Sequence, residues 1–397
     1  MDILELNQIA RHHDKEETKM FLKKMPRDKK DFRISCFGKN YLVAVRRLSP
    51  KECDTLQGIP DWYRYGKTSN MQHYKMIGNA WQVDTIKHCF ESLRCIRRPL
   101  RVWSLFDGMG CAYIALKELN IPIDVYVSSE IDKFALEVER INIHGIKQVG
   151  SITSLNTDEL MRKYGIPDLI CGGSPCTDMS FVGTQRGMIT MTKEEVYTLE
   201  RYLELKEQGF TFEGQSYLFW EFKRILSEVQ KVSPHVLFFL ENVEMQDKWE
   251  KCISHTLGIR GVHINSSLVS AQSRRRIYWS NIKKRYVGEH NLFGSLYQDD
   301  VFEMPSYTTD ISQSKDKKIV LKDILENDVD ERYYLSSSLA KDIILNEANS
   351  NTASYQIDRI RKQIRGVNDK AICLCASMYR GGSNNAVTYI VELFNID

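Results

Sequence analysis

From Leu100 to about residue 280, short apolar runs alternate with longer stretches in which apolar residues recur at helical spacing. A short apolar run between polar residues is typical of a buried strand, and a repeat every three to four residues is typical of an amphipathic helix. We expect strands at 101–106, 123–129, 168–171, 235–240, 262–269 and 276–280, and helices at 111–119, from 133 onward, and at 215–232. This alternation predicts an α/β fold with a doubly wound sheet, whose ligands bind at the carboxyl ends of the strands.

The chain on either side of this region follows other patterns. Ser49, Pro50 and Glu52 are typical of an N-cap, a first helical residue and a capping-box partner, which predicts a helix over 48–56. A turn is expected at 57–63 and a second helix over 78–93. Residues 286–370 are polar and show no strand–helix alternation, which indicates a smaller second domain.

Composition narrows the class of protein. Hydrophobic residues make up 42% of the 397 positions, which is typical of a globular chain. No apolar run approaches the roughly 20 residues that span a bilayer, and the polar N-terminus does not resemble a secretory signal, so we expect a cytoplasmic protein. The ten cysteines lack metal-knuckle spacing, so we expect reduced thiols and no metal site. The net charge is only +3, but basic residues cluster at 23–33 and 274–276, where they either contact phosphates or form a solvated face.

A glycine-containing turn follows the first predicted strand. Phe106, Asp107, Gly108 and Gly110 open the next helix, where glycines let a ligand approach the backbone and the helix N-terminus offers N–H groups. The second strand ends at Glu130, whose carboxylate is placed to accept hydrogen bonds from both hydroxyls of a ribose. The alternative is an ordinary strand–helix turn. Two glycines without a GxGxxG pattern favour S-adenosylmethionine over NAD.

A second candidate loop follows the strand at 168–171. Two glycines lead into Ser174, Pro175 and Cys176, which places a thiol just beyond a strand end, where α/β enzymes carry their chemistry. A lone cysteine is more often a small core residue. The strand at 235–240 ends in Glu241 and Asn242, so the carboxylate and the thiol are expected at neighbouring strand ends, although Asn242 also fits a helix N-cap.

An arginine-rich run, 272–276, enters the last predicted strand. Alternation along a strand places Arg274 and Arg276 on one face and Arg275 on the other. Two arginines facing the cleft are expected to hold a base carbonyl, a phosphate or the Glu241 carboxylate.

Taken together, these runs resemble the motifs of the cytosine-5 DNA methyltransferases. The segments that carry the resemblance are Phe106 to Gly110, Gly173 to Cys176, Glu241 to Val243 and Gln272 to Arg276, in this order. The Phe-Asp-Gly form, with Leu218 to Phe222 after the loop, is similar to the eukaryotic de novo enzymes and to their phage and bacterial relatives. The resemblance implies a Rossmann-like methyltransferase sheet with a second, smaller target-recognition domain.

The motif order departs from that family. Residues 47–60 resemble its ninth motif and 72–83 its tenth, which normally come last, whereas 370–390 resemble the segment before the ninth motif. The chain is therefore identified as a circular permutation, which is tolerated where chain ends lie close together. We expect 1–45 to be an N-terminal arm of the small domain, 46–95 to hold the permuted motifs packing on the catalytic domain, 96–285 to be the catalytic domain, and 286–397 the target-recognition region.

The resemblance also implies residue roles. Catalysis falls to Cys176 as nucleophile, with Glu241, Arg274 and Arg276, and substrate contacts fall to Ser174, Asn242 and Gln272. S-adenosyl-L-methionine, which leaves as S-adenosyl-L-homocysteine, is expected to contact Phe106, Asp107, Gly108, Gly110, Glu130, Ile131, Ser151, Ile152, Pro175, Leu218, Asn79 and Trp81. The expected partner is double-stranded DNA with a flipped-out cytosine, and a cognate restriction endonuclease is a possible second partner. The alternative is a tRNA cytosine-5 methyltransferase.

The segment that follows Cys176 is much longer than a typical connection between a strand and a helix. About forty residues separate Cys176 from Leu218, and Thr192 to Gln208 has the pattern of an amphipathic helix inserted into the catalytic loop.

Overall fold

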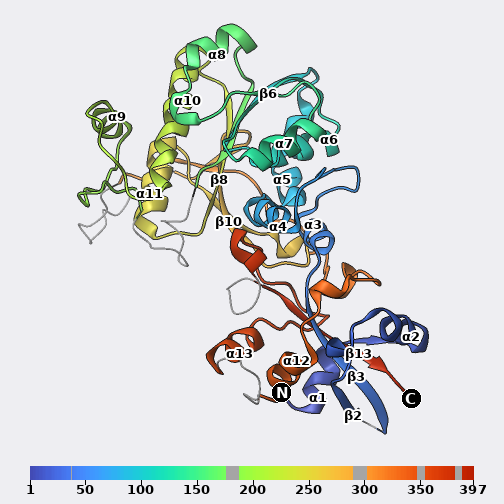
Figure 1. The fold of residues 1–397 in the computed structure, drawn as a ribbon. Helices are drawn as coiled ribbons and strands as arrows, with labels where there is room; N and C mark the ends of the chain where they lie inside the picture. Colours follow the sequence, from blue (N-terminus) through green and yellow to red (C-terminus); the bar gives the residue numbers. More distant parts are fainter. Residues whose placement is uncertain (37, 176–186, 289–301, 347–353, 381–386) are drawn as a thin grey trace. The chain divides into compact units, whose positions relative to one another are not determined.

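The computed structural model describes residues 1–36, 38–175, 187–288, 302–346, 354–380 and 387–397. The chain forms two compact units (Figure 1). Unit 1 contains Met1–Gln82, Ser266–Arg274 and Lys315–Asp397, and unit 2 contains Val83–Asn265 and Arg275–Ser314. These boundaries do not coincide with the four functional segments expected from the sequence, and that functional division stays a prediction.

Unit 2 is built on a seven-stranded sheet of order β6-β5-β4-β7-β8-β10-β9. The first five strands are parallel, and β10 runs antiparallel to both of its neighbours. The strands are β4 (Leu100–Leu105), β5 (Ile123–Ser129), β6 (Lys147–Gln148), β7 (Leu169–Gly173), β8 (Leu237–Val243), β9 (Val262–Asn265) and β10 (Arg275–Ser280). The chain starts in the middle at β4 and winds outward in both directions, so the predicted doubly wound α/β class is confirmed.

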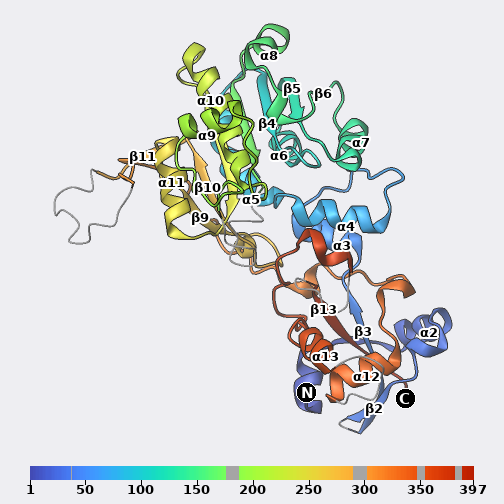
Figure 2. The ribbon, with the colours of Figure 1, turned by 60° about the vertical axis from the view of Figure 1, so that its left-hand side comes forward.

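Helices cover both faces of this sheet (Figures 1 and 2). One face carries α5 (Val83–Phe90), α6 (Cys111–Glu118) and α7 (Lys133–Asn142), and the other carries α8 (Thr157–Tyr164), α10 (Phe219–Val232) and α11 (Asp247–Leu257). Because both faces are covered, most residues of the central strands β4, β7 and β8 are buried. The core includes four fully buried tryptophans: Trp103, Trp220, Trp249 and Trp279. Unit 2 also contains α9 (Leu199–Glu207) and a small sheet of β11 (Lys284–Tyr286) and β12 (Tyr307–Thr309).

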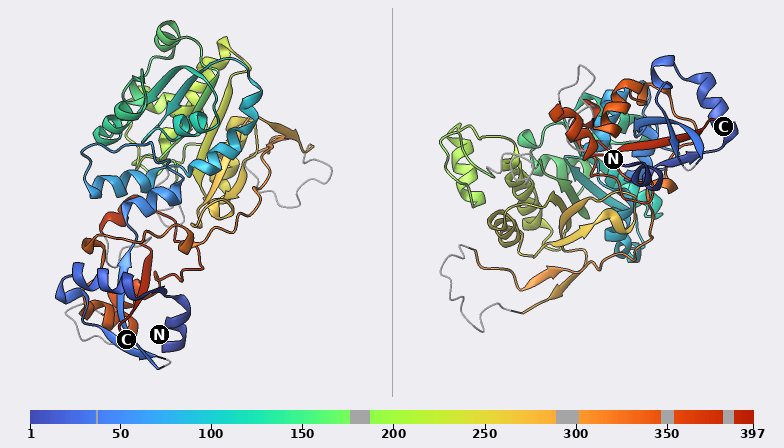
Figure 3. Two further views of the ribbon diagram at one scale, coloured as in Figure 1. Left: turned by 90° about the vertical axis from the view of Figure 1, so that its right-hand side faces the viewer. Right: turned by 90° about the horizontal axis from the view of Figure 1, so that it is seen from below.

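Unit 1 joins the two ends of the chain in one sheet of order β1-β13-β3-β2 (Figure 3). The C-terminal strand β13 (Tyr389–Asn395) lies between β1 (Arg11–His13) and β3 (Lys39–Arg47), and β2 (Arg33–Cys36) completes the sheet. Ile396 N–H donates to Asn40 O at 3.0 Å, so the C-terminus lies beside the start of β3. The helices of this unit are α1 (Ile3–Ile9), α2 (Lys15–Lys24), α3 (Pro50–Gln57), α4 (Asn70–Asn79), α12 (Ser337–Leu345) and α13 (Ser354–Arg361).

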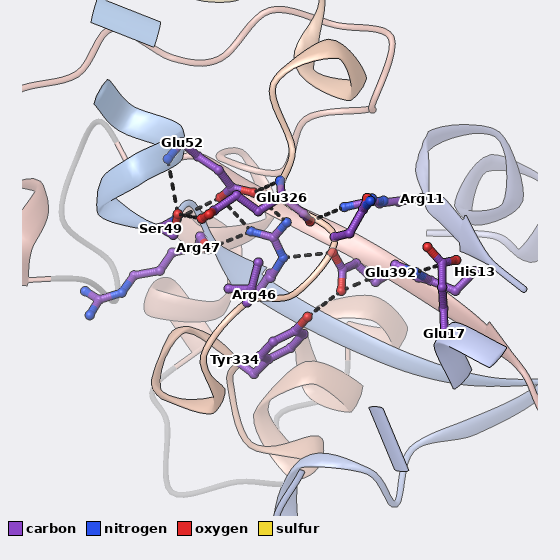
Figure 4. A network of polar contacts seen from close by, with 12 residues as sticks. Arg11, His13, Glu17, Arg46, Arg47, Ser49, Glu52, Glu326, Tyr334 and Glu392 are labelled. Atoms are coloured by element: carbon purple, nitrogen blue, oxygen red, sulfur yellow. Dashed lines mark hydrogen bonds and ion pairs between the residues drawn. The ribbon is translucent and has the colours of Figure 1, made fainter. Parts of the chain in front are cut away.

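A buried ion-pair network connects β3, β13 and α3 (Figure 4). The Arg46 guanidinium is fully buried and donates through Nε to Glu392 Oε1 at 2.8 Å. Its two terminal nitrogens donate to Glu52 at 2.8 and 2.9 Å. The Tyr334 hydroxyl donates to Glu392 Oε2 at 2.7 Å, and Ser49 N–H donates to Glu52 Oε2 at 2.7 Å. Both carboxylates are thereby satisfied without water, as a buried charge requires.

The helix expected over 48–56 is confirmed, with a complete capping box between Ser49 and Glu52. The single helix expected over 78–93 is wrong, because α4 ends at Asn79 and α5 begins at Val83. The physical reason is tertiary: the Gln57 amide donates to Ile77 O and Ala80 O, and these bonds hold the chain in an extended turn.

Other expected boundaries also need correction. The strand expected over 262–269 stops at Asn265, where a 3-10 turn (Ser266–Leu268) begins. The inserted helix begins only at Leu199, where Thr198 accepts from Arg201 N–H as N-cap. Strand β8 continues through Val243, so Asn242 is a strand residue and not a helix N-cap.

Candidate active site

The candidate site of unit 2 lies where the strand order reverses. Strand β4 lies between β5 and β7, and ligands of open α/β sheets bind beyond the carboxyl ends of the strands at such a point. The glycine-containing turn follows β4, and the run that leads to Cys176 follows β7. The sheet therefore brings the two predicted loops to one edge.

The turn after β4 has the backbone of a ligand cradle. Phe106, Gly108 and Gly110 all have positive φ, at 59°, 63° and 79°. A Cβ on Gly110 would lie 2.7 Å from Ile143 Cδ1, whereas a Cβ on Gly108 would meet nothing within 4 Å. Gly110 is also the N-cap of α6 and has no side chain to cap that helix. The open space beside Gly108 and the α6 N-terminus without a side-chain cap fit the methionine part of S-adenosylmethionine.

Glu130 connects the ends of β4 and β5. Its Oε2 accepts from Gly108 N–H at 2.8 Å, and its Oε1 accepts from Ile131 N–H and Asp132 N–H at 2.7 and 2.8 Å. Each carboxylate oxygen has two acceptor positions, so these three bonds orient the group and leave one position, on Oε2, for a hydroxyl donor. The Ile131 side chain is 69% exposed beside it, as a residue that packs on a ligand ring should be.

Asp107 follows Phe106 in this turn, and its predicted role toward the cofactor stays a prediction. Its carboxylate is buried beneath the turn, where Oδ1 accepts from the Ser104 hydroxyl at 2.5 Å and from the Tyr126 hydroxyl at 2.8 Å. Burial raises the pKa of this carboxyl, and burial together with the charge of Asp107 raises the pKa of the neighbouring Glu139. Glu139 on α7 is itself held by Ser128 and Gln148.

The sequence predicts that Asp107 contacts the cofactor. It does not predict that Ser104 and Tyr126 hydrogen-bond to this carboxylate, or that Glu139 lies next to it. The signal for Glu139 was its spacing from Ala135 and Val138, which places it on the buried face of the helix. For Ser104 and Tyr126, inside a plain apolar strand pattern, the sequence offers no comparable signal.

The remaining cofactor candidates of unit 2 lie around this turn. Ser151 is the N-cap of a 3-10 turn (Ile152–Ser154) that follows β6, and the Ile152 side chain is buried. Leu218 is half-buried at the start of α10 and packs against the core. Pro175 is half-buried beyond the end of β7.

The end of β8 contacts both the loop after β7 and the neighbouring strand β10. Asn242 donates through Nδ2 to Ser174 Oγ at 3.0 Å, which ties β8 to the loop after β7. Glu241 is paired in register with Gly173 and is 8% exposed. Arg276 Nε, on the neighbouring β10, lies 2.9 Å from Glu241 Oε1. The structure thus brings Ser174, Glu241, Asn242 and Arg276 together, while Cys176 lies outside the described residues.

Four other predicted residues belong to unit 1. Gln272 is fully buried and donates to Leu56 O at 3.0 Å and to Gln57 Oε1 at 2.8 Å. Arg274 donates to Leu374 O at 3.0 Å and to Ala80 O at 2.8 Å. The expected alternation of Arg274 with Arg276 is wrong, because β10 begins only at Arg275. Asn79 is exposed and Trp81 is half-buried at the end of α4, and their role toward the cofactor stays a prediction.

The chain also matches a known protein family. The family model described as C-5 cytosine-specific DNA methylase matches residues 5–95 and 100–388. The chain belongs to this family. The resemblance inferred from the motifs is confirmed.

Individual relatives match parts of the chain. DNA (cytosine-5)-methyltransferase DRM1 of Arabidopsis thaliana is 34% identical over 162 residues, which cover 38% of this chain and 26% of the plant protein. Orphan methyltransferase M.SPRI of Bacillus phage SPR is 25% identical over 310 residues, 68% of this chain and 60% of the phage protein. The chain thus spans about a quarter of the plant relative. A crystal structure of a Spodoptera frugiperda DNMT2 variant, 17% identical, aligns with a TM-score of 0.43 over 74% of each chain.

The described residues show neither a metal-binding group nor a membrane-spanning helix. They contain no group of three or more His, Cys, Asp or Glu side chains placed to hold a metal ion. In the same residues, no helix has both the length and the apolar character needed to cross a membrane.

Proposed function

We propose that this chain is a DNA (cytosine-5-)-methyltransferase that uses S-adenosylmethionine, with Cys176 as nucleophile. The observation that supports it most is the Ser174–Asn242 and Glu241–Arg276 arrangement. It fixes Ser174, which precedes Cys176 by two residues in the sequence, and it holds a carboxylate at the neighbouring strand end. The proposal places the protein in the cytoplasm of a bacterial or phage-infected cell, and a cognate restriction endonuclease remains a predicted partner.

The proposed chemistry starts from the weak nucleophilicity of cytosine carbon 5. The Cys176 thiolate adds to carbon 6, which forms an S–C6 bond and turns the ring into an enamine that is nucleophilic at carbon 5. When bound, S-adenosylmethionine supplies an electrophilic methyl group at this position. A base then removes the carbon-5 proton, the S–C6 electron pair returns to sulfur, and the aromatic ring and the thiolate are restored.

The proposed roles of the other residues follow from their contacts. Glu241 accepts a hydrogen bond from the amino group of the flipped cytosine, since a carboxylate held at Oε1 by Arg276 still has acceptor positions. N3 of cytosine is itself an acceptor, so it bonds to Glu241 only when a proton lies between the two atoms. Arg276 contacts the base carbonyl, and Asn242 keeps the Ser174 loop against β8. Gly108, Gly110 and Glu130 hold the cofactor, and Ser151 and Ile152 receive its adenine.

The proposal is tested by expressing the chain in cells that lack cytosine methylation and measuring 5-methyldeoxycytidine in digested DNA by mass spectrometry. We expect the modified nucleoside with the wild type and none with Cys176→Ser. Purified duplex DNA and purified tRNA, offered separately with labelled S-adenosylmethionine, test the alternative. Methylation of tRNA alone would overturn the DNA assignment and leave the cysteine chemistry in place.

A further inference from the structure

The insert that follows Cys176 is anchored on unit 2 in its described part, residues 187–213, here called the loop insert. Its apolar side chains Met188, Val196, Tyr202 and Leu205 are at most 1% exposed and belong to the core around Trp220 and Trp249. A Cβ on Gly187 would lie 2.0 Å from the Trp249 ring, so the backbone lies directly against the indole. The loop insert therefore contributes to the packed core of unit 2.

A buried carboxylate connects the loop insert to α10. Glu221 is fully buried, and its Oε1 accepts from the Tyr202 hydroxyl and from Lys206 Nζ, both at 2.5 Å. Its Oε2 accepts from Arg224 Nε at 2.8 Å. Burial, and next the bond to Glu221, raises the pKa of the Tyr202 hydroxyl, which stays a neutral donor. Two of the three donors to this carboxylate thus come from α9, and its charge is compensated on both oxygens.

The two cations of this cluster also reach the 3-10 turn after β6. Lys206 Nζ donates to Thr153 O at 3.1 Å. Arg224 Nη2 donates to Ile152 O at 3.3 Å and to Leu155 O at 3.2 Å. The turn's own backbone bonds, at 3.4 Å from Leu155 N to Ile152 O and 3.2 Å from Ser154 N to Ser151 O, are similar in length to the bonds from these two cations. Charge-assisted bonds are stronger than neutral ones, so the position of this turn depends on Lys206 and Arg224.

We infer that the loop insert positions the adenine side of the cofactor site, with Lys206 as a positioning residue that acts through the 151–155 turn. This inference rests on the proposed function, in which Ser151 and Ile152 receive the adenine. It assigns the insert to cofactor affinity and not to DNA contact. Loosening the turn should weaken S-adenosylmethionine binding and leave the thiol chemistry intact.

The test compares Lys206→Met, which keeps the aliphatic stem, with Lys206→Arg, which keeps a cation, and with Lys193→Met as the matched control. Lys193 lies in the same insert and pairs with Glu213 on the surface, away from the 151–155 turn. The measurements are the Kd for S-adenosylhomocysteine by calorimetry, and KM for cofactor, KM for duplex DNA and kcat. For Lys206→Met we expect a rise of on the order of tenfold in the Kd and in the cofactor KM. We expect kcat and the DNA KM to stay within about twofold, and both Lys206→Arg and Lys193→Met to lie near the wild type.

A second readout separates positioning from general loosening of the fold. The hypoxanthine analogue of S-adenosylhomocysteine lacks the adenine amino group, and the wild type should prefer the natural ligand. That preference should shrink in Lys206→Met and persist in Lys193→Met. A raised DNA KM with unchanged cofactor affinity, a fall in kcat alone, or an unchanged preference would each overturn the inference. A wild type that binds no S-adenosylhomocysteine would instead overturn the proposed function beneath it.

Discussion

Replacing Arg46 by methionine should destabilise unit 1 far more than removing an exposed arginine. The side chain is fully buried between Glu52 and Glu392, so its removal leaves two buried carboxylates without their cation. Breaking a buried pair in this way costs about 3–5 kcal/mol, whereas an exposed pair contributes about 0–1 kcal/mol. Arg332, which pairs with Asp330 at 2.9 Å on the surface, is the matched control as Arg332→Met.

The assay is hydrogen exchange with mass spectrometry on peptides that cover β3 and β13. It reports local opening, which a global melting curve of a two-unit chain does not isolate. Arg46→Met should lower protection of these strands by at least about a hundredfold, and Arg332→Met by less than about fivefold. Adding Glu52→Gln and Glu392→Gln to Arg46→Met removes the unpaired charges, so the triple variant should regain part of the loss.

The stability difference between the wild type and Arg46→Met should change with pH in one direction. Burial opposes ionisation of Glu392, but the charges and hydrogen bonds of Arg46 and His13 together outweigh it and hold the pKa of this carboxyl well below its usual value of 4.5. A lowered folded pKa contributes stability above pH 4.5 that is lost as the pH falls through the folded pKa. The gap between wild type and Arg46→Met should therefore be largest near pH 7 and narrow below pH 4.5. A gap under about 1 kcal/mol at pH 7, or one that widens in acid, would refute this reasoning.

Three further changes test other parts of the structure. Burial and the Asp107 charge raise the pKa of Glu139 from 4.5 to about 10. The stability that its protonated form contributes is therefore complete below pH 4.5 and is lost as the pH rises toward 10. The melting temperature of Glu139→Gln should lie below that of the wild type by an amount that shrinks between about pH 5 and 9, and a constant difference would contradict this. Gly78→Ala would place a Cβ 2.1 Å from the Cys375 carbonyl carbon, so it should lower the melting temperature by several degrees, and an unchanged value would show that this contact is absent. Glu241→Gln should reduce kcat by about 10²–10⁴ with the Kd for S-adenosylhomocysteine unchanged, and near-wild-type turnover would remove Glu241 from the proposed mechanism.

Local signals in the sequence account for much of the fold. The capping box at Ser49 and Glu52 and the left-handed Gly108 and Gly110 behave as their residue types require, because the causes lie within a few positions along the chain. Short apolar runs likewise predict the central strands. The strand order then follows from the strand–helix alternation, which brings the loops after β4 and β7 to one edge.

The departures have tertiary causes. The break between α4 and α5 depends on the Gln57 amide, more than twenty positions away from Ala80. Asp107 has the appearance of a ligand-binding residue, yet its partner Tyr126 comes from the next strand and draws the carboxylate inward. Arg274 precedes β10 and belongs to unit 1, a division that no pattern within 272–276 indicates.

The joining of the two chain ends was expected only from the motif order. The pairing of β13 with β3, from Tyr389 with Arg47 to Asn395 with Tyr41, places residues 389–395 beside the segment that resembles the ninth motif, as the motif order predicts. The full permuted arrangement stays a prediction, since the roles of Asn79 and Trp81 toward the cofactor are untested.

The most direct test of the central claim is covalent trapping. A duplex pool of mixed sequence that carries 5-fluorodeoxycytidine is incubated with the protein and S-adenosylmethionine, because fluorine cannot leave carbon 5 as a proton does and the S–C6 bond persists. The account predicts a protein–DNA adduct that depends on the cofactor, with the modified nucleotide on the peptide containing Cys176 and none with Cys176→Ser. Methylation that proceeds without any adduct, or an adduct on another cysteine, would contradict it.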